Sequence, residues 1–280
     1  MADPLTLLAV HAHPDDESSS TGGVLARYSA EGVRTVLVTC TNGEFGDGPD
    51  HVKPGQDGHD EDQVAKTRLA ELERACEHLG VTHAELLGYH DSGMPDWPYK
   101  ERPDVFWNVP FEEPVERVLE LFRRYRPDVV VTYHDNGGYN HPDHLRAHQV
   151  AVRACELAGD SGPAKLYYIA RRPRDFEKLR ERMREAGMEV PGPPQRRNDE
   201  EWRRRMEETE RLITTTVDTS AVADKKRAAL AAHASQLDQS WWIRLPEDAV
   251  SEVFAEETFI RAEDRTGAPV PEDDLFAGLR

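Results

Sequence analysis

Cysteine is scarce in this sequence of 280 residues. The three cysteines, Cys40, Cys76 and Cys155, are widely separated and form no Cys-x-x-Cys pair. This spacing excludes a Cys-x-x-Cys motif for redox chemistry or metal binding. Cys40 lies in an apolar, strand-like run, and the other two lie on faces of predicted helices. The pattern predicts buried, reduced thiols, which fit a cytoplasmic protein.

Long hydrophobic runs are absent as well. No segment approaches the length that a transmembrane helix requires. The first four residues carry no basic flank, and the apolar run that follows them is too short for a secretion signal. We therefore expect a cytoplasmic protein without a membrane partner.

Basic residues are outnumbered by acidic ones. The chain has 35 Lys and Arg against 53 Asp and Glu, which gives a formal net charge of −18. Binding to a nucleic-acid backbone depends on Lys and Arg that neutralise phosphates, so this charge argues against a nucleic-acid partner. It also disfavours an anionic membrane surface. The length allows a globular protein with a substantial core.

The first part of the chain alternates apolar runs of strand length with amphipathic helical patterns. Such alternation predicts an α/β, Rossmann-like fold, with a mostly parallel sheet and helices on both faces. A dinucleotide is not expected, because no Gly-x-Gly-x-x-Gly follows the first strand. The predicted strands are 5–10, 33–39, 85–87, 128–134 and 165–170. Of the predicted helices, the first runs from the first motif to about residue 30, two span 62–79 and 113–125, and the last follows the fourth strand and ends at about 157.

The rest of the chain predicts an elaboration of this core. We expect a Rossmann-like core over residues 1–170, a charged helical insertion over 171–215 and a C-terminal part over 216–280 that packs on the core, in one domain overall. Two amphipathic helices are expected over 171–213, separated by Val190-Pro191-Gly192-Pro193-Pro194 and exposing a solvated charged face. A helix at 225–236 and a strand at 258–261 are expected near the C-terminus.

A cluster of ionisable side chains directly follows the first predicted strand. The stretch His11-Ala12-His13-Pro14-Asp15-Asp16-Glu17 holds five of them in seven residues. Burying so much charge is costly unless something compensates it, and a divalent cation is the obvious compensator. His13 and Asp16 have the spacing and the ligand chemistry to hold one.

A second cluster lies far downstream, again after a strand-like run. Residues 135–140 form a turn by composition, and His141-Pro142-Asp143-His144 then opens a predicted helix. Ligands bind at the carboxyl ends of strands in open α/β sheets. Two such strand ends would supply His13, Asp16 and His144 as ligands and leave a coordination position for water, as in a catalytic zinc site.

Each cluster alone has a plainer interpretation. Pro and Asp favour turns for backbone reasons, Asp15 could be only a helix N-cap, and Glu17 could be only a first-turn acid favoured by the helix dipole. Two such clusters, each directly after an apolar strand, favour the metal site. His11 alternates with His13 along the strand, which predicts a packed or hydrogen-bonded histidine on the opposite face. His134 is either a neighbour of the site or a satisfied strand-end histidine.

These motifs resemble the LmbE-like, or PIG-L, family of zinc-dependent deacetylases, which remove acetyl from N-acetylglucosaminyl compounds. The pattern is closest to the mycothiol branch, which holds the acetylglucosaminyl-inositol deacetylase and the mycothiol S-conjugate amidase. Amidase-type members tend to carry a lysine after the first motif, where this chain has residues 18–23 without one. The likeness covers most of the chain apart from about 95–110 and 171–215, through His13-Pro14-Asp15-Asp16-Glu17, Thr41-Asn42-Gly43-Glu44, Arg68, residues 88–94, His141-Pro142-Asp143-His144 and residues 228–236.

The resemblance implies roles for particular residues. Asp15 resembles the general base that deprotonates a metal-bound water. Tyr139 and His141 resemble the pair that stabilises the oxyanion, with His141 also a proton donor. The same comparison implies His13, Asp16 and His144 as metal ligands and Arg68, Asp91 and Glu44 as sugar-binding residues.

Four further features keep alternatives open. Asp143 either orients one of its neighbouring histidines by a hydrogen bond or is a first-turn acid, and His233 either contacts the sugar or bonds a neighbouring loop. Segment 44–62 has seven acids and one lysine and is either a solvated loop or a lid. The aromatic side chains of segment 95–111 either pin that loop to the surface or form a substrate wall.

The sequence thus predicts a metal-dependent amide hydrolase that deacetylates an N-acetylated amino sugar or glycoside. Zinc is the expected cofactor, although a His₂Asp ligand set also suits Fe²⁺. We expect a small sugar-type substrate as the partner, and a homo-oligomer is compatible with the sequence. The alternatives are a mycothiol S-conjugate amidase, a tailoring deacylase of a natural product, and a non-catalytic metal- or sugar-binding module. Asp15, Tyr139 and His141 argue against the last, because a binding module needs no base.

Overall fold

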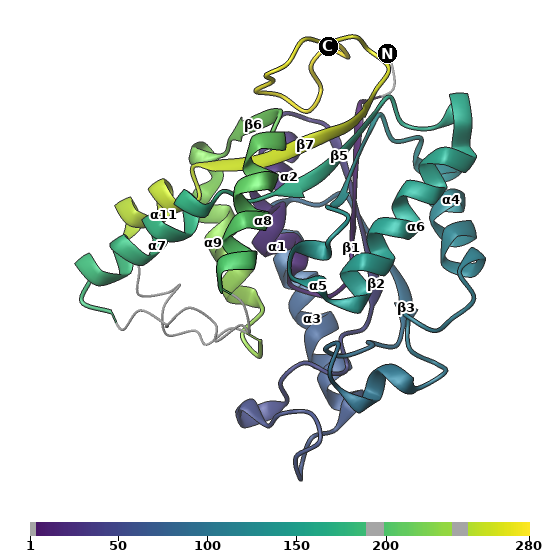
Figure 1. The fold of residues 1–280 in the computed structure, drawn as a ribbon, viewed down its shortest axis with the longest axis vertical. Coiled ribbons are helices and arrows are strands. Elements are labelled where there is room, and N and C mark those ends of the chain that lie inside the picture. The colour runs from purple at the N-terminus through teal and green to yellow at the C-terminus, as the bar shows by residue number, and fades with distance from the viewer. Residues whose placement is uncertain (1–3, 189–198, 237–245) are drawn as a thin grey trace.

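Seven strands form one sheet in the order β3-β2-β1-β4-β5-β7-β6, within the residues that the computed structural model describes: 4–188, 199–236 and 246–280 (Figure 1). β1 to β5 pair in parallel, and β7 runs antiparallel to both β5 and β6. The prediction of a mostly parallel α/β sheet is therefore confirmed. The strands are β1 (Thr6–His11), β2 (Arg34–Thr41), β3 (His83–Tyr89), β4 (Val129–Tyr133), β5 (Lys165–Ala170), β6 (Thr215–Asp218) and β7 (Glu256–Asp264).

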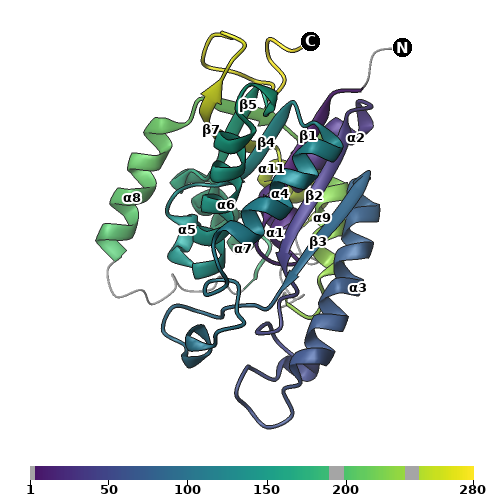
Figure 2. The same ribbon diagram turned by 90° about the vertical axis from the view of Figure 1, so that its right-hand side faces the viewer.

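Helices cover both faces of the sheet (Figure 2). One apolar core lies between the sheet and α2, α3 and α9, and a second lies between the sheet and α4 and α6. The helices are α1 (Asp16–Ser20), α2 (Gly22–Ala30), α3 (Glu61–Leu79), α4 (Glu112–Tyr125), α5 (Gly137–Asn140), α6 (Pro142–Ala158), α7 (Pro173–Glu185), α8 (Asp199–Leu212), α9 (Ala223–Ala232) and α11 (Glu247–Val253).

The central strand β1 shows why the run from Leu7 to Val10 is apolar without interruption. All six of its residues are buried. Leu7 and Ala9 belong to one core cluster, whereas Leu8 and Val10 belong to the other. A parallel strand that is covered on both faces needs apolar side chains at every position. The strand therefore rigidly places the polar residues that follow it at the carboxyl edge of the sheet.

The helix predicted after the first motif is in fact two helices. It breaks at Thr21, whose hydroxyl donates to the Glu17 carbonyl. The second helix, α2, begins with two glycines, and the carboxylate of Glu257 accepts the N–H groups of Gly23 and Val24 at 2.8 Å each. Glu257 lies on β7, more than 230 residues away in the chain, so no local pattern predicts this cap.

The C-terminal part extends the same sheet. β6 was not predicted, and α9 ends at Ala232 rather than at 236. Two helices occupy the charged region, as predicted, while the break expected at 190–194 lies outside the described residues. The proposed division at 170 and 215 stays a prediction, and the pairing of β7 with β5 supports its single-domain form. The three cysteines are buried and unpaired, and no helix in the described ranges is long and apolar enough to cross a membrane.

Candidate metal centre

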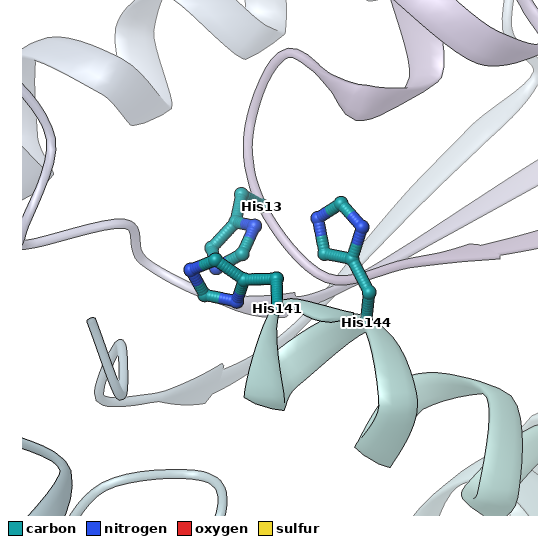
Figure 3. A group of neighbouring side chains, drawn as sticks. All are labelled: His13, His141 and His144. Atoms are coloured by element: carbon teal, nitrogen blue, oxygen red, sulfur yellow. The ribbon is translucent and has the colours of Figure 1, made fainter. Parts of the chain in front are cut away.

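The two histidine clusters meet at the carboxyl edge of the sheet. β1 and β4 are parallel neighbours, so the segments that follow them emerge side by side. The ring centroid of His13 lies 4.6 Å from that of His141 and 5.3 Å from that of His144, and Figure 3 shows the three imidazoles gathered above the start of α6. The structure thus brings together side chains that are about 130 residues apart in the chain.

One carboxylate oxygen links the two predicted histidine ligands. Asp16 Oδ2 lies 3.2 Å from His13 Nδ1 and 3.3 Å from His144 Nε2. Ligands about 2.0–2.1 Å from a tetrahedral zinc ion are separated by about 3.3–3.4 Å. His144 Nε2 is buried and makes no hydrogen bond, although the Asp16 oxygen is near. A buried nitrogen without a hydrogen bond that faces a carboxylate fits a shared metal ion, so these three residues fit zinc.

The other ring nitrogens fix the orientation of both imidazoles. His144 Nδ1 donates to the Gly137 carbonyl at 3.0 Å, which leaves the lone pair on Nε2. His13 Nε2 donates to Asp143 Oδ2 at 3.2 Å, which leaves the lone pair on Nδ1. Metal-ligating histidines are commonly held in this way by a carbonyl or a carboxylate. The orienting role predicted for Asp143 stays a prediction, and this contact supports it.

Electrostatics at the centre favour a cation. Burial alone would raise the pKa of Asp16, but His144 and His13 hold that pKa well below its usual range. Asp91 Oδ1 lies 3.7 Å from His13 Nε2, on the side that also faces Asp143. His13 is therefore surrounded by three carboxylates, which attract positive charge.

Asp15 has an unusual backbone. Its φ of 118° and ψ of −26° are strained for a residue other than glycine, and such strain concentrates at functional sites. The residue occupies the N-cap position of α1, but its side chain makes no capping hydrogen bond. Its Oδ2 instead accepts from Arg68 Nη2 at 3.1 Å. Burial raises the pKa of Asp15, and the guanidinium of Arg68 opposes that rise. The alternative that Asp15 only caps a helix is thus not supported.

His141 and Tyr139 lie beside the predicted ligands. His141 Nδ1 accepts the Asp143 N–H at 3.2 Å, so a neutral ring carries its proton on Nε2. Burial, together with the neighbouring imidazoles of His13 and His144, lowers the pKa of His141 to about 2. One nitrogen of His141 is close enough to the other two histidines to be a ligand, but its tautomer makes it a donor. Tyr139 is 42% exposed, and its ring centroid lies 5.7 Å from that of His141.

The three residues predicted to bind sugar are all buried and already bonded to protein groups. Arg68 donates to the carbonyls of Gly43 and Pro14 at 2.8 and 2.6 Å as well as to Asp15. Glu44 accepts from the Asn42 amide and from the Asp91 N–H. Asp91 accepts the Gly93 N–H at 2.7 Å. Arg68 and Asp91 border the metal centre, whereas Glu44 is one hydrogen bond further away, on the backbone N–H of Asp91. The roles of all three residues toward a sugar stay predictions.

Each of the remaining histidines of the motifs has one ring nitrogen paired with a protein group, while Nδ1 of His11 and Nδ1 of His233 are buried without a hydrogen bond. His233 Nε2 lies 2.7 Å from Glu17 Oε1, and both side chains are fully buried, which favours a structural role for His233 over sugar contact. His11 Nε2 pairs with the Thr21 hydroxyl at 2.8 Å, as its packed position predicts. His134 Nδ1 lies 2.6 Å from the exposed Asp135 carboxylate, which favours the strand-end interpretation.

A family model described as GlcNAc-PI de-N-acetylase, PIG-L, matches residues 8–155 of the chain. This match covers most of β1, all of β2, β3 and β4, and both histidine motifs. The chain belongs to the PIG-L family. The family and the full-length relatives described next confirm the prediction of an amide-hydrolysing enzyme of the deacetylase type.

Curated relatives are similar over the whole chain. The chain is 39% identical to a 1D-myo-inositol 2-acetamido-2-deoxy-alpha-D-glucopyranoside deacetylase of Salinispora arenicola, over 98% of this chain and 91% of that protein. It is also 39% identical to the protein of the same name from Thermobifida fusca, over 97% of this chain and 98% of that protein.

Solved structures share the fold at low sequence identity. The N,N'-diacetylchitobiose deacetylase of Pyrococcus horikoshii superposes with a TM-score of 0.58 at 18% identity, over 92% of this chain and 84% of that one. The 4-carboxy-2-hydroxymuconate hydratase GalB of Pseudomonas putida gives 0.62 at 18% identity, over 95% and 99%. Because a hydratase shares the architecture of this PIG-L protein, the fold alone does not decide the reaction.

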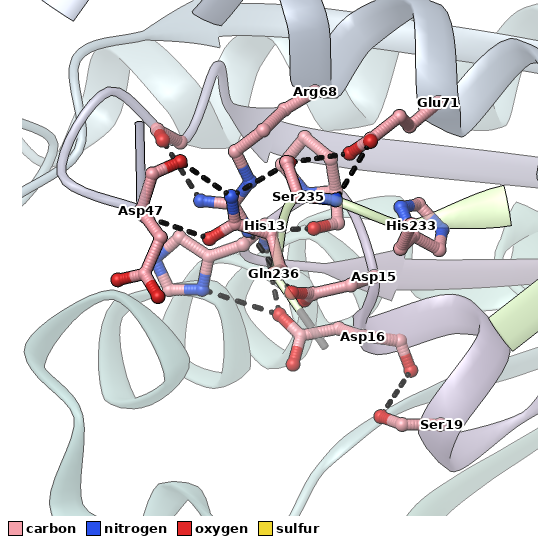
Figure 4. A network of polar contacts seen from close by, with 12 residues as sticks. His13, Asp15, Asp16, Ser19, Asp47, Arg68, Glu71, His233, Ser235 and Gln236 are labelled. Carbon is pink, nitrogen blue, oxygen red and sulfur yellow. Dashed lines mark hydrogen bonds and ion pairs between the residues drawn. The ribbon is translucent and has the colours of Figure 1, made fainter. Parts of the chain in front are cut away.

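Sequence reasoning missed a polar network behind Arg68 (Figure 4). The segment after α9 ties three parts of the molecule together: His233 to α1, Ser235 to Glu71 of α3, and Gln236 to the backbone of Asp47. The segment was noticed for its resemblance, but its partners lie 164 to 216 residues away. No spacing of residues in the sequence predicts such pairs.

The two irregular loops contact each other beside the centre. Phe45 stacks on Tyr99 with ring centroids 4.2 Å apart, and Arg102 pairs with Glu61 at 2.9 Å. Phe106 is fully buried in the core that α4 and α6 cover. At least this aromatic side chain therefore pins the loop, while a lid or a substrate wall stays a prediction.

Proposed function

We propose that this protein is a zinc-dependent N-deacetylase acting on 1D-myo-inositol 2-acetamido-2-deoxy-alpha-D-glucopyranoside. The observation that carries the metal chemistry is His144 Nε2, which is buried without a hydrogen bond and faces the carboxylate shared with His13. The substrate is supported by similarity along the full chain to deacetylases that bear this name.

His13, Asp16 and His144 would hold the cation. When bound, a divalent ion supplies Lewis acidity that polarises the amide carbonyl and makes water a stronger nucleophile at neutral pH. Zinc suits two imidazoles and one carboxylate, and Fe²⁺ suits the same donors. The hydrogen bonds that the two ligand rings donate to the Gly137 carbonyl and the Asp143 carboxylate keep both lone pairs turned toward Asp16.

Asp15 accepts a proton from the attacking water in this proposal. It precedes a ligand in the chain, and its carboxylate is held by Arg68 rather than by the backbone of α1. A positioned base of this kind contributes about 10²–10⁴ in rate. Arg68 also holds the carbonyl of Pro14, so the strained turn and the carboxylate are fixed by one guanidinium.

His141 and Tyr139 stabilise the oxyanion that forms when the amide carbonyl is attacked. His141 is neutral and presents its Nε2 proton, because its Nδ1 already accepts from Asp143. Tyr139 offers a phenol hydroxyl from the partly exposed side of the centre. Removing a single oxyanion donor typically costs about 3 kcal/mol in the transition state. We further propose that the enzyme works in the cytoplasm, in keeping with its buried, unpaired cysteines.

The test is a comparison of substrates with the purified protein. We expect acetate release from the acetylglucosaminyl-inositol compound, its loss after treatment with a chelator, and its return when Zn²⁺ is restored; a parallel restoration with Fe²⁺ identifies the preferred metal. Preferential cleavage of a cysteine–sugar conjugate would instead assign the protein as an amidase. A protein that binds zinc but hydrolyses no acylated sugar would contradict the proposal and favour a binding module.

A further inference from the structure

We propose that Ser92 is a positioning residue of the metal centre, which acts through Asp143 on the His13 imidazole. This inference rests on the metal site of the proposed function. Ser92 follows β3, Asp143 opens α6 and His13 follows β1, so three separate elements of the carboxyl edge meet in one chain of hydrogen bonds. Nothing in the sequence motifs assigns a role to this serine.

Ser92 binds both oxygens of the Asp143 carboxylate. Its backbone N–H donates to Oδ2 at 2.9 Å, and its hydroxyl donates to Oδ1. The direction of the second bond is fixed, because the Ser92 hydroxyl accepts the backbone N–H of Trp107 at 2.9 Å and an ionised carboxylate only accepts. Ser92 and Asp143 are both fully buried, so water does not compete for these bonds.

The Asp143 carboxylate thereby has a single orientation available. Two donors come from Ser92 and the third is His13 Nε2 at 3.2 Å. With the carboxylate held, the His13 proton stays on Nε2, and the Nδ1 lone pair faces Asp16 and the metal position. Removal of such outer partners typically costs about 10–100-fold in metal affinity.

The same hydroxyl connects the centre to segment 95–111. Trp107 belongs to that loop, and its backbone N–H donates to the Ser92 hydroxyl oxygen, which in turn binds Asp143. A shift of the loop at Trp107 is thus expected to alter the ligand geometry, and occupation of the centre is expected to hold the loop.

The experiment measures zinc affinity by competition with a chromophoric chelator. We expect Ser92→Ala to bind Zn²⁺ about 10–100-fold more weakly than the wild type. Thr35→Val is the matched control: it removes another fully buried hydroxyl, which accepts the Thr82 N–H at 3.1 Å near the amino end of β2, the edge opposite the centre. Its zinc affinity is expected to equal that of the wild type.

A double variant tests whether Ser92 acts through Asp143. Asp143→Ala is expected to weaken zinc binding, and Ser92→Ala added to it is expected to cause no further loss, since coupled residues are non-additive. Additive losses would overturn the proposed route. Equal affinity of Ser92→Ala and the wild type would overturn the proposal while leaving the metal site intact, whereas a wild type that binds no zinc would overturn the proposed function itself.

Hydrogen exchange of the wild-type chain gives a readout that does not depend on whether a variant folds. Zinc is expected to slow exchange of the Ser92 and Trp107 amides relative to the Thr82 amide, because both donate into the chain of bonds that ends at His13. Unchanged exchange at both amides on zinc binding would overturn the proposed coupling.

Discussion

Two regions of the molecule bury several charged groups, and they differ in how those charges are satisfied. One is the metal centre at the carboxyl edge of the parallel strands. The other is a cluster that we call the C-terminal lock. The lock consists of Lys165, Tyr167, Thr215, Arg261 and Glu272.

In the lock, every oxygen of the buried carboxylate has two partners. Glu272 Oε1 accepts from Lys165 at 2.5 Å and from Arg261 at 2.9 Å. Its Oε2 accepts from Tyr167 at 2.8 Å and from Thr215 at 3.0 Å. This set fastens the segment after β7 to the sheet, and it leaves nothing for a ligand to complete.

The metal centre is incomplete by comparison. His144 Nε2 is buried without a hydrogen bond, and Asp15 lies next to the predicted ligand Asp16 in a strained backbone conformation. Buried polar groups are paired in native proteins with few exceptions, and the exceptions point to an ion or a catalytic role. The contrast teaches that the two clusters differ in the pairing around their carboxylates: four donors surround Glu272, whereas the Asp16 oxygen faces a ring nitrogen that makes no hydrogen bond, an arrangement that a shared cation would complete.

Among the variants that test this comparison, His144→Ala is expected to have the largest effect. The variant removes Nε2 of His144, the buried nitrogen that makes no hydrogen bond. We therefore expect it to lose both zinc, as measured by elemental analysis, and deacetylase activity, as measured by acetate release. His148→Ala on the same helix is the control, since His148 bonds the Tyr133 carbonyl and not the centre, and it is expected to keep its zinc. Full zinc occupancy in His144→Ala would count against the ligand role.

Asp15→Asn is expected to separate metal binding from turnover. Asparagine tolerates positive φ better than most residues, so the strained turn persists, and the predicted ligands are untouched. The deacetylation rate is expected to fall by about 10²–10⁴ because the base is gone, while zinc content stays at the wild-type level. Wild-type turnover in this variant would exclude Asp15 as the base.

Glu272→Ala tests the opposite region. It leaves Lys165 fully buried, with Asp264 at 3.9 Å as its nearest remaining acid. Breaking a buried ion pair from one side costs about 3–5 kcal/mol, so we expect a loss of that size in the free energy of unfolding from urea titration. The zinc affinity of the folded variant is expected to be unchanged, and weakened zinc binding would show that the two regions are coupled.

The smallest effect is expected from His233→Gln, and it depends on pH. Burial and the positive charge of Arg68 lower the pKa of His233, but the carboxylates of Glu17 and Asp15 raise it more, so the folded pKa lies above the ordinary 6.5. The ion pair with Glu17 therefore stabilises the fold fully below about pH 6.5 and loses this contribution as pH rises through the raised pKa.

The urea-unfolding difference between wild type and His233→Gln is accordingly expected to be about 1–3 kcal/mol near pH 6 and to shrink as the solution becomes alkaline. A difference that grows with pH would mean that His233 is neutral in the folded protein.

Much of the fold was predictable from local patterns. β5 has the predicted bounds, and α3 and α4 each begin one residue before the predicted start. These elements carry a strong period of burial, because one face or both faces contact the cores. β6 was missed and β7 was predicted too short, since buried polar residues such as Thr215, Glu257 and Thr258 interrupt the apolar pattern, and their partners lie far away in the chain.

The sequence by itself determined that His13, Asp16 and His144 lie just after two apolar, strand-like runs, and with that the family and the class of chemistry. It did so because apolar runs and turn residues are local signals that specify where each strand ends. Only the tertiary structure decided which imidazole nitrogens carry lone pairs, that Ser92 holds Asp143, and that Arg68 holds Asp15. The bonds from Ser92 and His13 to Asp143 and from Arg68 to Asp15 join residues 51 to 130 positions apart, and a hydrogen bond between distant residues depends on the packing of the strands and helices that carry them, which no local pattern encodes.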